Sequence, residues 1–76
     1  MPVAYVLATV RTGREYDVIE EIKRMKGVKE VTLTYGLWDL VIKVETETLG
    51  ELDNIVTNIR RIEGVEQTAT LIGVGR

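Results

Sequence analysis

The chain has 76 residues, enough for one domain with a small hydrophobic core. It contains no cysteine and no histidine and carries a formal charge of −2, which excludes disulfides and thiolate metal sites and argues against histidine catalysis and nonspecific nucleic-acid binding. Because no apolar run is long enough to span a membrane, and because so small a core is marginal, we expect a cytoplasmic protein that self-associates.

The first part of the chain predicts a strand followed by a helix. Residues 3–10, VAYVLATV, are apolar on both alternating faces, as in a buried strand. Thr12 and Glu15 have the spacing of a capping box, so we expect a helix from this point to about Lys26. Its buried stripe comprises Val18, Ile19, Ile22 and Met25. Gly27 is expected to end this helix with a positive φ.

The second part predicts two strands, a helix and a last strand. Residues 28–35 and 38–45 read as strands with Gly36 between them, which predicts an antiparallel hairpin. Thr48 and Glu51 form a second capping box. The helix that follows carries its apolar residues on one side: Leu49, Leu52, Ile55, Val56, Ile59 and Ile62. Gly64 ends it, and residues 65–74 form the last strand.

An internal repeat supports this order of elements. Shifted by 37 residues, IEEIKRMKGV at 19–28 aligns with VTNIRRIEGV at 56–65. The chain is therefore β-α-β twice over, which predicts an α+β, ferredoxin-like βαββαβ fold in one domain over residues 1–76. Right-handed crossovers then give a four-stranded antiparallel sheet with both helices on one face.

The face of the sheet that the helices leave open is predicted to be an interface. Val3, Tyr5 and Leu7 point to one side of the first strand, while Val41 lies on the outer side of the third. Each apolar side chain left in water loses the stabilisation of about 1.5–3 kcal/mol that its burial would give. We therefore expect this face to pack on the same face of a second copy, giving a two-fold dimer.

Catalytic chemistry has few candidates. The chain has no serine in addition to its lack of cysteine and histidine, and it contains no glycine-rich phosphate loop. The acidic groups Glu45, Glu47 and Glu51 lack the spacing of a cation-binding loop. The sheet aromatics lack the spacing of RNA-stacking residues. We expect a protein that is not an enzyme and that uses neither a cofactor nor a metal.

Two polar segments stand outside the pattern of core and surface. One is YGLWD, residues 35–39, and the other is GVEQTAT, residues 64–70, where Thr68 and Thr70 share one strand face. A pocket for a small zwitterion needs backbone N–H groups or hydroxyls for the carboxylate, an acceptor for the ammonium, and an apolar wall. The glycine turn, the aspartate, the two threonines and the tryptophan supply these parts.

These two segments also carry a family resemblance. The hairpin YGLWDLVIKV, followed by a helix and IRRIEGVEQTATLIGV, resembles the effector-binding (RAM) domain of the Lrp/AsnC family of transcription regulators. The hallmarks of that domain are a G-x-x-D turn, here Gly36 to Asp39, and a G-V-x-x-T-x-T segment, here Gly64 to Thr70. The resemblance extends from about Ala4 to Val74.

The resemblance implies a ligand, a site and partners. Members of the family form dimers through their sheets, dimers often assemble into octameric rings, and amino acids bind between dimers. Carried over residue by residue, the ligand-binding residues are Tyr35, Gly36, Leu37, Trp38, Asp39, Thr68 and Thr70. The chain starts almost directly at the first strand and so resembles the stand-alone RAM proteins, which lack the helix-turn-helix. We therefore expect no direct DNA binding, and we expect co-assembly with full-length Lrp/AsnC regulators.

Two alternatives stay open at this point. An ACT-like domain senses amino acids on a similar plan, and its ligand-contact glycine usually follows the first strand, where this chain has Gly13. A small dimeric α+β barrel enzyme also fits the order of elements, although such enzymes tend to use a His, Asn or Asp in the cavity between helices and sheet.

Overall fold

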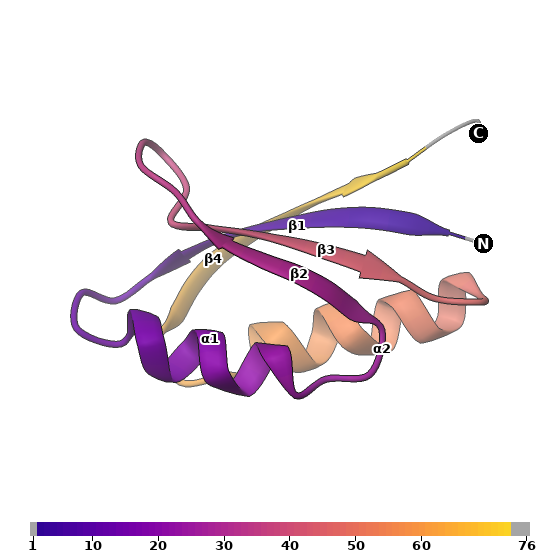
Figure 1. Ribbon diagram of the computed structural model, residues 1–76, viewed down its shortest axis with the longest axis horizontal. Helices are drawn as coiled ribbons and strands as arrows, with labels where there is room; N and C mark the ends of the chain where they lie inside the picture. The colour runs from indigo at the N-terminus through magenta and orange to yellow at the C-terminus, as the bar shows by residue number, and fades with distance from the viewer. Residues whose placement is uncertain (1, 74–76) are drawn as a thin grey trace.

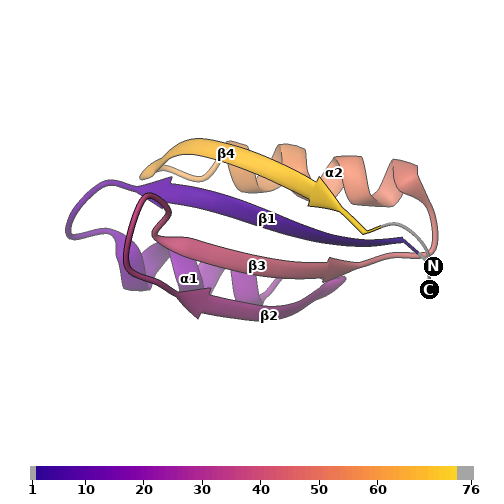
Figure 2. The same ribbon diagram turned by 90° about the horizontal axis from the view of Figure 1, so that it is seen from above.

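Six elements make up the computed structural model, which describes residues 2–73. They are β1 (Val3–Val10), α1 (Glu15–Lys23), β2 (Val28–Leu33), β3 (Leu40–Glu45), α2 (Leu49–Arg60) and β4 (Val65–Ile72). The strands form one antiparallel sheet in the order β2-β3-β1-β4. Both helices lie against the same face of it (Figures 1 and 2). The predicted ferredoxin-like βαββαβ fold is confirmed.

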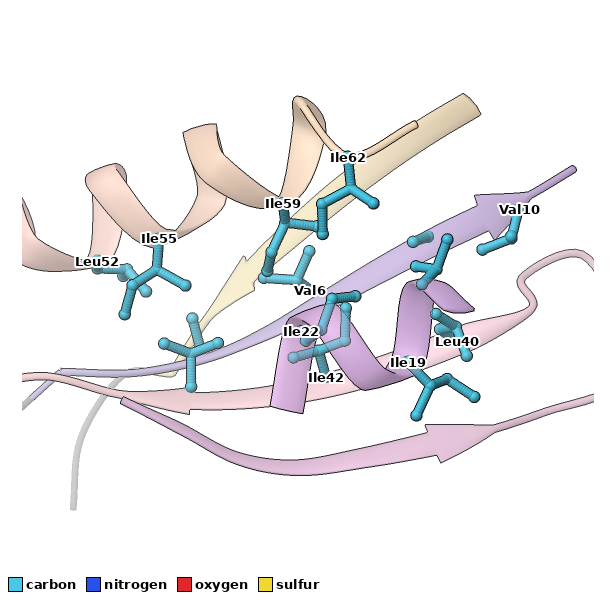
Figure 3. Close-up of a cluster of buried hydrophobic side chains, with 14 residues drawn as sticks. Val6, Val10, Ile19, Ile22, Leu40, Ile42, Leu52, Ile55, Ile59 and Ile62 are labelled. Carbon is cyan, nitrogen blue, oxygen red and sulfur yellow. The ribbon is translucent and has the colours of Figure 1, made fainter. Parts of the chain in front are cut away.

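The core lies between the helices and the two central strands (Figure 3). Alternate residues of these strands face the helices and are buried: Ala4, Val6, Ala8 and Val10 in β1, and Leu40, Ile42 and Val44 in β3. The helices meet them with part of each predicted stripe: Val18, Ile19 and Ile22 in α1 and Leu52, Ile55 and Ile59 in α2. Met25 and Val56, also predicted, are only partly buried against this core. The period-2 and period-3.6 patterns of the sequence thus meet in one apolar layer.

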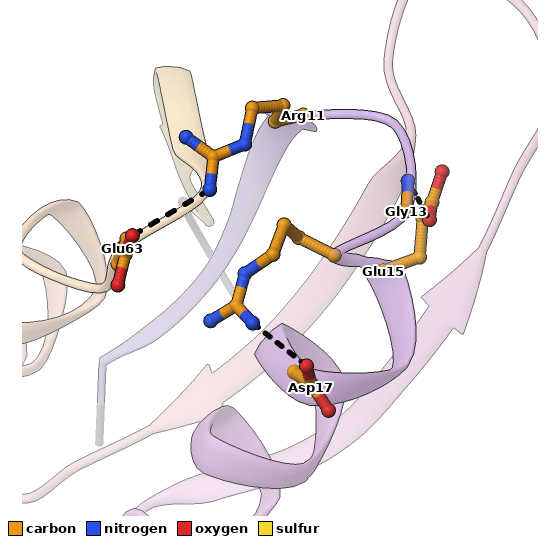
Figure 4. Close-up of polar contacts among 6 residues, drawn as sticks. Arg11, Gly13, Glu15, Asp17 and Glu63 are labelled. Carbon is orange, nitrogen blue, oxygen red and sulfur yellow. Dashed lines mark hydrogen bonds and ion pairs between the residues drawn. The ribbon is translucent and has the colours of Figure 1, made fainter.

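The first predicted capping box does not form. Arg14 takes the N-cap position of α1, and no side chain caps the first turn of the helix. Thr12 lies exposed in the preceding turn, and Glu15 Oε1 accepts a hydrogen bond from the Gly13 N–H at 2.9 Å (Figure 4). The prediction was wrong because the turn at Thr12 and Gly13 separates the threonine from the helix.

The second predicted capping box forms. Thr48 has an extended backbone, and its Oγ1 accepts a hydrogen bond from the Glu51 N–H at 3.1 Å. Glu51 Oε1 in turn accepts from the Glu47 N–H at 3.0 Å, one residue earlier than in the standard motif. The start of α2 is therefore fixed by side chains at both ends of the motif.

Some predicted boundaries differ from the structure. The helix expected to reach Lys26 ends at Lys23, so Gly27, whose φ is +99° as predicted, lies in the turn that leads to β2. Leu49, predicted to be buried, is 61% exposed because it begins α2 beyond the edge of the core. The predicted end of the last strand at Val74 lies outside the described residues.

The link between β2 and β3 is longer than predicted. The strands were expected to run to Tyr35 and from Trp38, with only a short turn around Gly36, but β2 ends at Leu33 and β3 begins at Leu40. The intervening residues 34–39 form a loop that rises on the side of the sheet opposite the helices (Figure 1). The reason is a set of hydrogen bonds at its base, described below.

The open face of the sheet carries the residues expected of an interface. Tyr5 on β1 lies directly opposite Leu71 on β4, and the two are 40% and 56% exposed. Leu7 lies opposite Ala69 on the same face, and both are partly buried. In a single copy of the chain these side chains form an apolar strip along the two adjoining strands.

Candidate functional site

The loop between β2 and β3 is anchored at its base by Thr34 and Asp39. The Thr34 N–H donates to the Asp39 carbonyl at 2.8 Å, and Thr34 Oγ1 donates to the Trp38 carbonyl at 2.7 Å. The Asp39 N–H donates to the Ala8 carbonyl at 2.9 Å. Asp39 Oδ2 accepts from the Val10 N–H at 2.8 Å. Four hydrogen bonds thus close the loop and tie it to the end of β1.

A pocket of about 620 Å³ brings parts of the two sequence motifs together. Its lining includes Trp38 from the loop and Thr68 and Thr70 from β4. Thr68 lies opposite Ala8 and Thr70 opposite Val6 in β1, so the two threonines share one strand face, as predicted. Because Ala8 and Val6 are buried against the helices, this face is the helix-facing one. Since β4 is an edge strand that runs beside α2 (Figure 2), this side is open to solvent at the sheet edge.

The rest of the lining comes from residues that the sequence motifs did not single out: Val56, Arg60, Val65, Glu66 and Gln67. Arg60 and Glu66 bring opposite charges to one pocket, and neither belongs to an ion pair among residues 2–73. A guanidinium and hydroxyls can bind a carboxylate, a carboxylate can bind an ammonium, and Trp38 with the two valines supplies apolar surface. The arrangement therefore suits a small zwitterion.

The other predicted site residues do not line this pocket of their own chain. Tyr35 and Leu37 are 104% and 89% exposed at the tip of the loop. Gly36 has a φ of +109° with open space around it, which suits a tight turn. Asp39 is half-buried beneath the loop. The assignment of these residues as ligand contacts stays a prediction.

Two further features bear on alternative sites. Within residues 2–73, no group of three or more carboxylates is arranged to hold a metal ion. A membrane-crossing helix is likewise missing from this part of the chain, since neither helix has the required length and apolarity. Gly13, the glycine that an ACT-like site would use, lies exposed in the β1–α1 turn and does not line this pocket.

The structure is thus a small ferredoxin-like domain with a polar pocket at the edge of its sheet. A family model described as the Lrp/AsnC ligand binding domain matches residues 3–74. The chain therefore belongs to the Lrp/AsnC ligand-binding domain family, which confirms the resemblance seen in the motifs.

Individual relatives agree with this assignment. The HTH-type transcriptional regulator FL11 of Pyrococcus furiosus is 35% identical over 69 residues, which are 91% of this chain and 46% of FL11. The chain thus spans about half the length of the curated relatives it matches. Among solved structures, FFRP-DM1 is 39% identical with a TM-score of 0.92, over 97% of this chain and 100% of that one. TTHA0845 of Thermus thermophilus is 38% identical with a TM-score of 0.94, over 100% of this chain and 96% of that one.

The family assignment settles the class of the domain. The matched family is a ligand-binding domain and the curated relative is a transcriptional regulator. The prediction of a regulatory domain that is not an enzyme is thus confirmed. The same assignment decides against both the ACT-like domain and the α+β barrel enzyme.

Proposed function

We propose that this domain is an amino-acid-sensing regulatory module. It binds a small amino acid or a related metabolite in the pocket between α2, β4 and Trp38, and a neighbouring dimer completes this cleft. In the cytoplasm it co-assembles with full-length Lrp/AsnC-type transcription regulators and alters their state. Its formal charge of −2 argues against a direct contact with DNA.

One observation carries the proposal. Trp38 and the pair Thr68 and Thr70 come from motifs some thirty residues apart in sequence, yet they line one pocket. Arg60 and Glu66 add a cation and an anion to that pocket. An amino acid offers the matching groups, since its carboxylate fits Arg60 and the hydroxyls, and its ammonium fits Glu66.

The exposed loop tip and the open sheet face support the assembly. Tyr35 and Leu37 project from the domain and are almost wholly exposed, which favours a role in the cleft of an adjoining dimer. The strip formed by Tyr5 and Leu71 on the open face favours dimers built sheet against sheet. Dimers joined through their loops then form a closed ring, which in this family is expected to be an octamer.

A thermal-shift screen of the standard amino acids tests the ligand. A ligand at about 100 times its Kd adds roughly 2.7 kcal/mol to the free energy of unfolding, which raises the melting temperature measurably. Arg60→Met should abolish the shift, because it removes the carboxylate partner. Lys23→Met, the equivalent change 37 residues earlier on α1, should leave the shift intact. If no amino acid shifts the wild-type chain, the sensing function is wrong.

Sedimentation at micromolar concentration tests the assembly. We expect a dimer or a larger ring, and Leu71→Glu should dissociate it because a charge would be buried at the interface. The matched control is Leu49→Glu, which changes another exposed leucine at the start of α2, away from the open face. A wild-type chain that sediments as a single 8.6 kDa species would contradict the proposed dimer.

A further inference from the structure

The strand β1 extends past the end of its pairing with β3. The register between them ends with Ala8 opposite Leu40, although β1 continues to Val10. If the register continued, Trp38 would lie opposite Val10 and its carbonyl would be the next acceptor for the Val10 N–H. That bond is absent from the described residues: the Val10 N–H donates to Asp39 Oδ2 at 2.8 Å.

The Trp38 carbonyl is engaged elsewhere. It accepts a hydrogen bond from Thr34 Oγ1 at 2.7 Å, inside the loop itself. The carboxylate of Asp39 therefore stands where a strand carbonyl would otherwise be, and satisfies the backbone donor of β1. Because the Asp39 carboxylate takes the place of the Trp38 carbonyl, the pairing with β1 stops at Leu40. Trp38 is therefore part of the loop rather than of β3.

Trp38 lines the pocket although the loop itself rises on the side of the sheet opposite the helices (Figure 1). Val10 lies opposite Val65 of β4, so the end of β1 is flanked by β4 on one side and by the base of the loop on the other. Trp38 and Val65 both line the 620 Å³ pocket, whereas Asp39 does not line it. The tryptophan thus reaches the pocket across the end of β1, and the bonds at the loop base hold it there.

From this geometry we infer that Asp39 is a positioning residue whose carboxylate holds the loop off the sheet and sets Trp38 as a wall of the pocket, without touching the ligand. This role rests on the proposed function, because it concerns the same pocket, and it differs from the ligand contact that the family resemblance implies. A charged acceptor is well suited to it, since a hydrogen bond to a carboxylate is stronger than one to a neutral group.

Asp39→Asn and Asp39→Ala separate the two roles. Asparagine keeps an acceptor oxygen for the Val10 N–H but carries no charge for an ammonium group, whereas alanine has neither. Trp38 is the chain's only tryptophan, so its emission reports the loop directly. We expect Asp39→Asn to keep the wild-type emission spectrum and the stabilisation by a mixture of the standard amino acids. Asp39→Ala should shift the emission to longer wavelength, increase quenching by acrylamide and weaken amino-acid binding about tenfold.

The controls cover the other outcomes. Asp53→Ala, on the exposed side of α2, should change neither emission nor binding. Thr34→Val removes the hydrogen bond to the Trp38 carbonyl and should shift the emission in the same direction as Asp39→Ala. If calorimetry shows that Asp39→Ala does not fold, Thr34→Val is used in its place. If the mixture stabilises no protein, the sensing function fails, but the emission still tests the positioning role. Asp39→Asn with normal emission and lost binding would overturn the inference, as would unchanged emission in Asp39→Ala or Thr34→Val.

Discussion

The two halves of the molecule, β1-α1-β2 and β3-α2-β4, share a core and differ at their surfaces. Ile22 and Ile59 lie 37 residues apart, and both are fully buried. Gly27 and Gly64 have the same spacing, with φ values of +99° and +105°. A Cβ added to Gly27 would lie 2.7 Å from Ile55 Cδ1, and one added to Gly64 would lie 3.3 Å from Cγ2 of the equivalent Val18. The repeat in the sequence is therefore a repeat of packing contacts.

The surfaces above these equivalent cores have diverged. Arg60, Thr68 and Thr70 line the pocket between α2 and β4. The equivalent positions in the first half are Lys23, Val31 and Leu33, and none of them lines this pocket. Two hydroxyl-bearing residues thus stand where the other half has apolar ones. The duplicated unit therefore supplies the scaffold, while the residues that differ in the second copy line the candidate site.

The largest effects should come from the shared core. Ile22→Ala and Ile59→Ala each remove side-chain volume from a fully buried position, and each should lower the free energy of unfolding by about 2–5 kcal/mol. Urea unfolding measures both. The stability of a domain of this size is on the order of 10 kcal/mol or less. If the alanine variants do not fold, Ile22→Val and Ile59→Val replace them, and each should lower the free energy of unfolding by about 0.5–1.5 kcal/mol.

Two results would break the equivalence. One is a large difference between Ile22 and Ile59, which would show that the two halves do not carry comparable parts of the core. The other is a large effect from Leu49→Ala, the control, because this leucine is 61% exposed and should cost little.

The next largest effects should come from the two equivalent glycines, Gly27 and Gly64, with Gly36 as the reference. Gly36→Ala measures the backbone strain alone, because its φ is +109° and nothing lies within 4 Å of the added methyl group. That strain should cost about 1 kcal/mol. Gly27→Ala and Gly64→Ala add a steric conflict, with the Glu45 carbonyl at 3.2 Å and Arg14 Cβ at 3.0 Å, and should cost about 1–3 kcal/mol. Thermal unfolding of the three variants ranks their losses of stability. If Gly36→Ala destabilises the domain as much as the other two do, backbone strain alone accounts for the loss.

The sequence predicted the core better than the site for a physical reason. Periodicity reports burial, and burial places Ile22, Ile59 and the central strands. The loop at residues 34–39 was predicted too short because the alternation in WDLVIKV continues through Trp38 and Asp39. Nothing in that alternation shows that the Asp39 carboxylate would replace a strand carbonyl.

The pocket residues Arg60 and Glu66 were missed for a related reason. A charged residue on the outer side of a helix or an edge strand usually faces solvent, and the sequence does not distinguish that situation from a pocket. Their position in the second copy of the repeat was the available signal. Arg60 lies four residues after Val56, on the side of α2 that turns toward the sheet edge, and Glu66 lies inside the motif that carries the threonines.

The smallest expected effect concerns the two capping motifs, one in each half. Thr48→Ala removes the acceptor for the Glu51 N–H and should cost about 1 kcal/mol, which lowers the melting temperature by roughly 4–8 °C in a domain of this size. Thr12→Ala should have almost no effect, because the Thr12 side chain makes no hydrogen bond within residues 2–73 and Arg14 takes the N-cap position. Calorimetry of the two variants compares them directly. Equal losses would mean that the first half is capped in solution as the second is, and that the two halves agree at their helix starts as well as in their core.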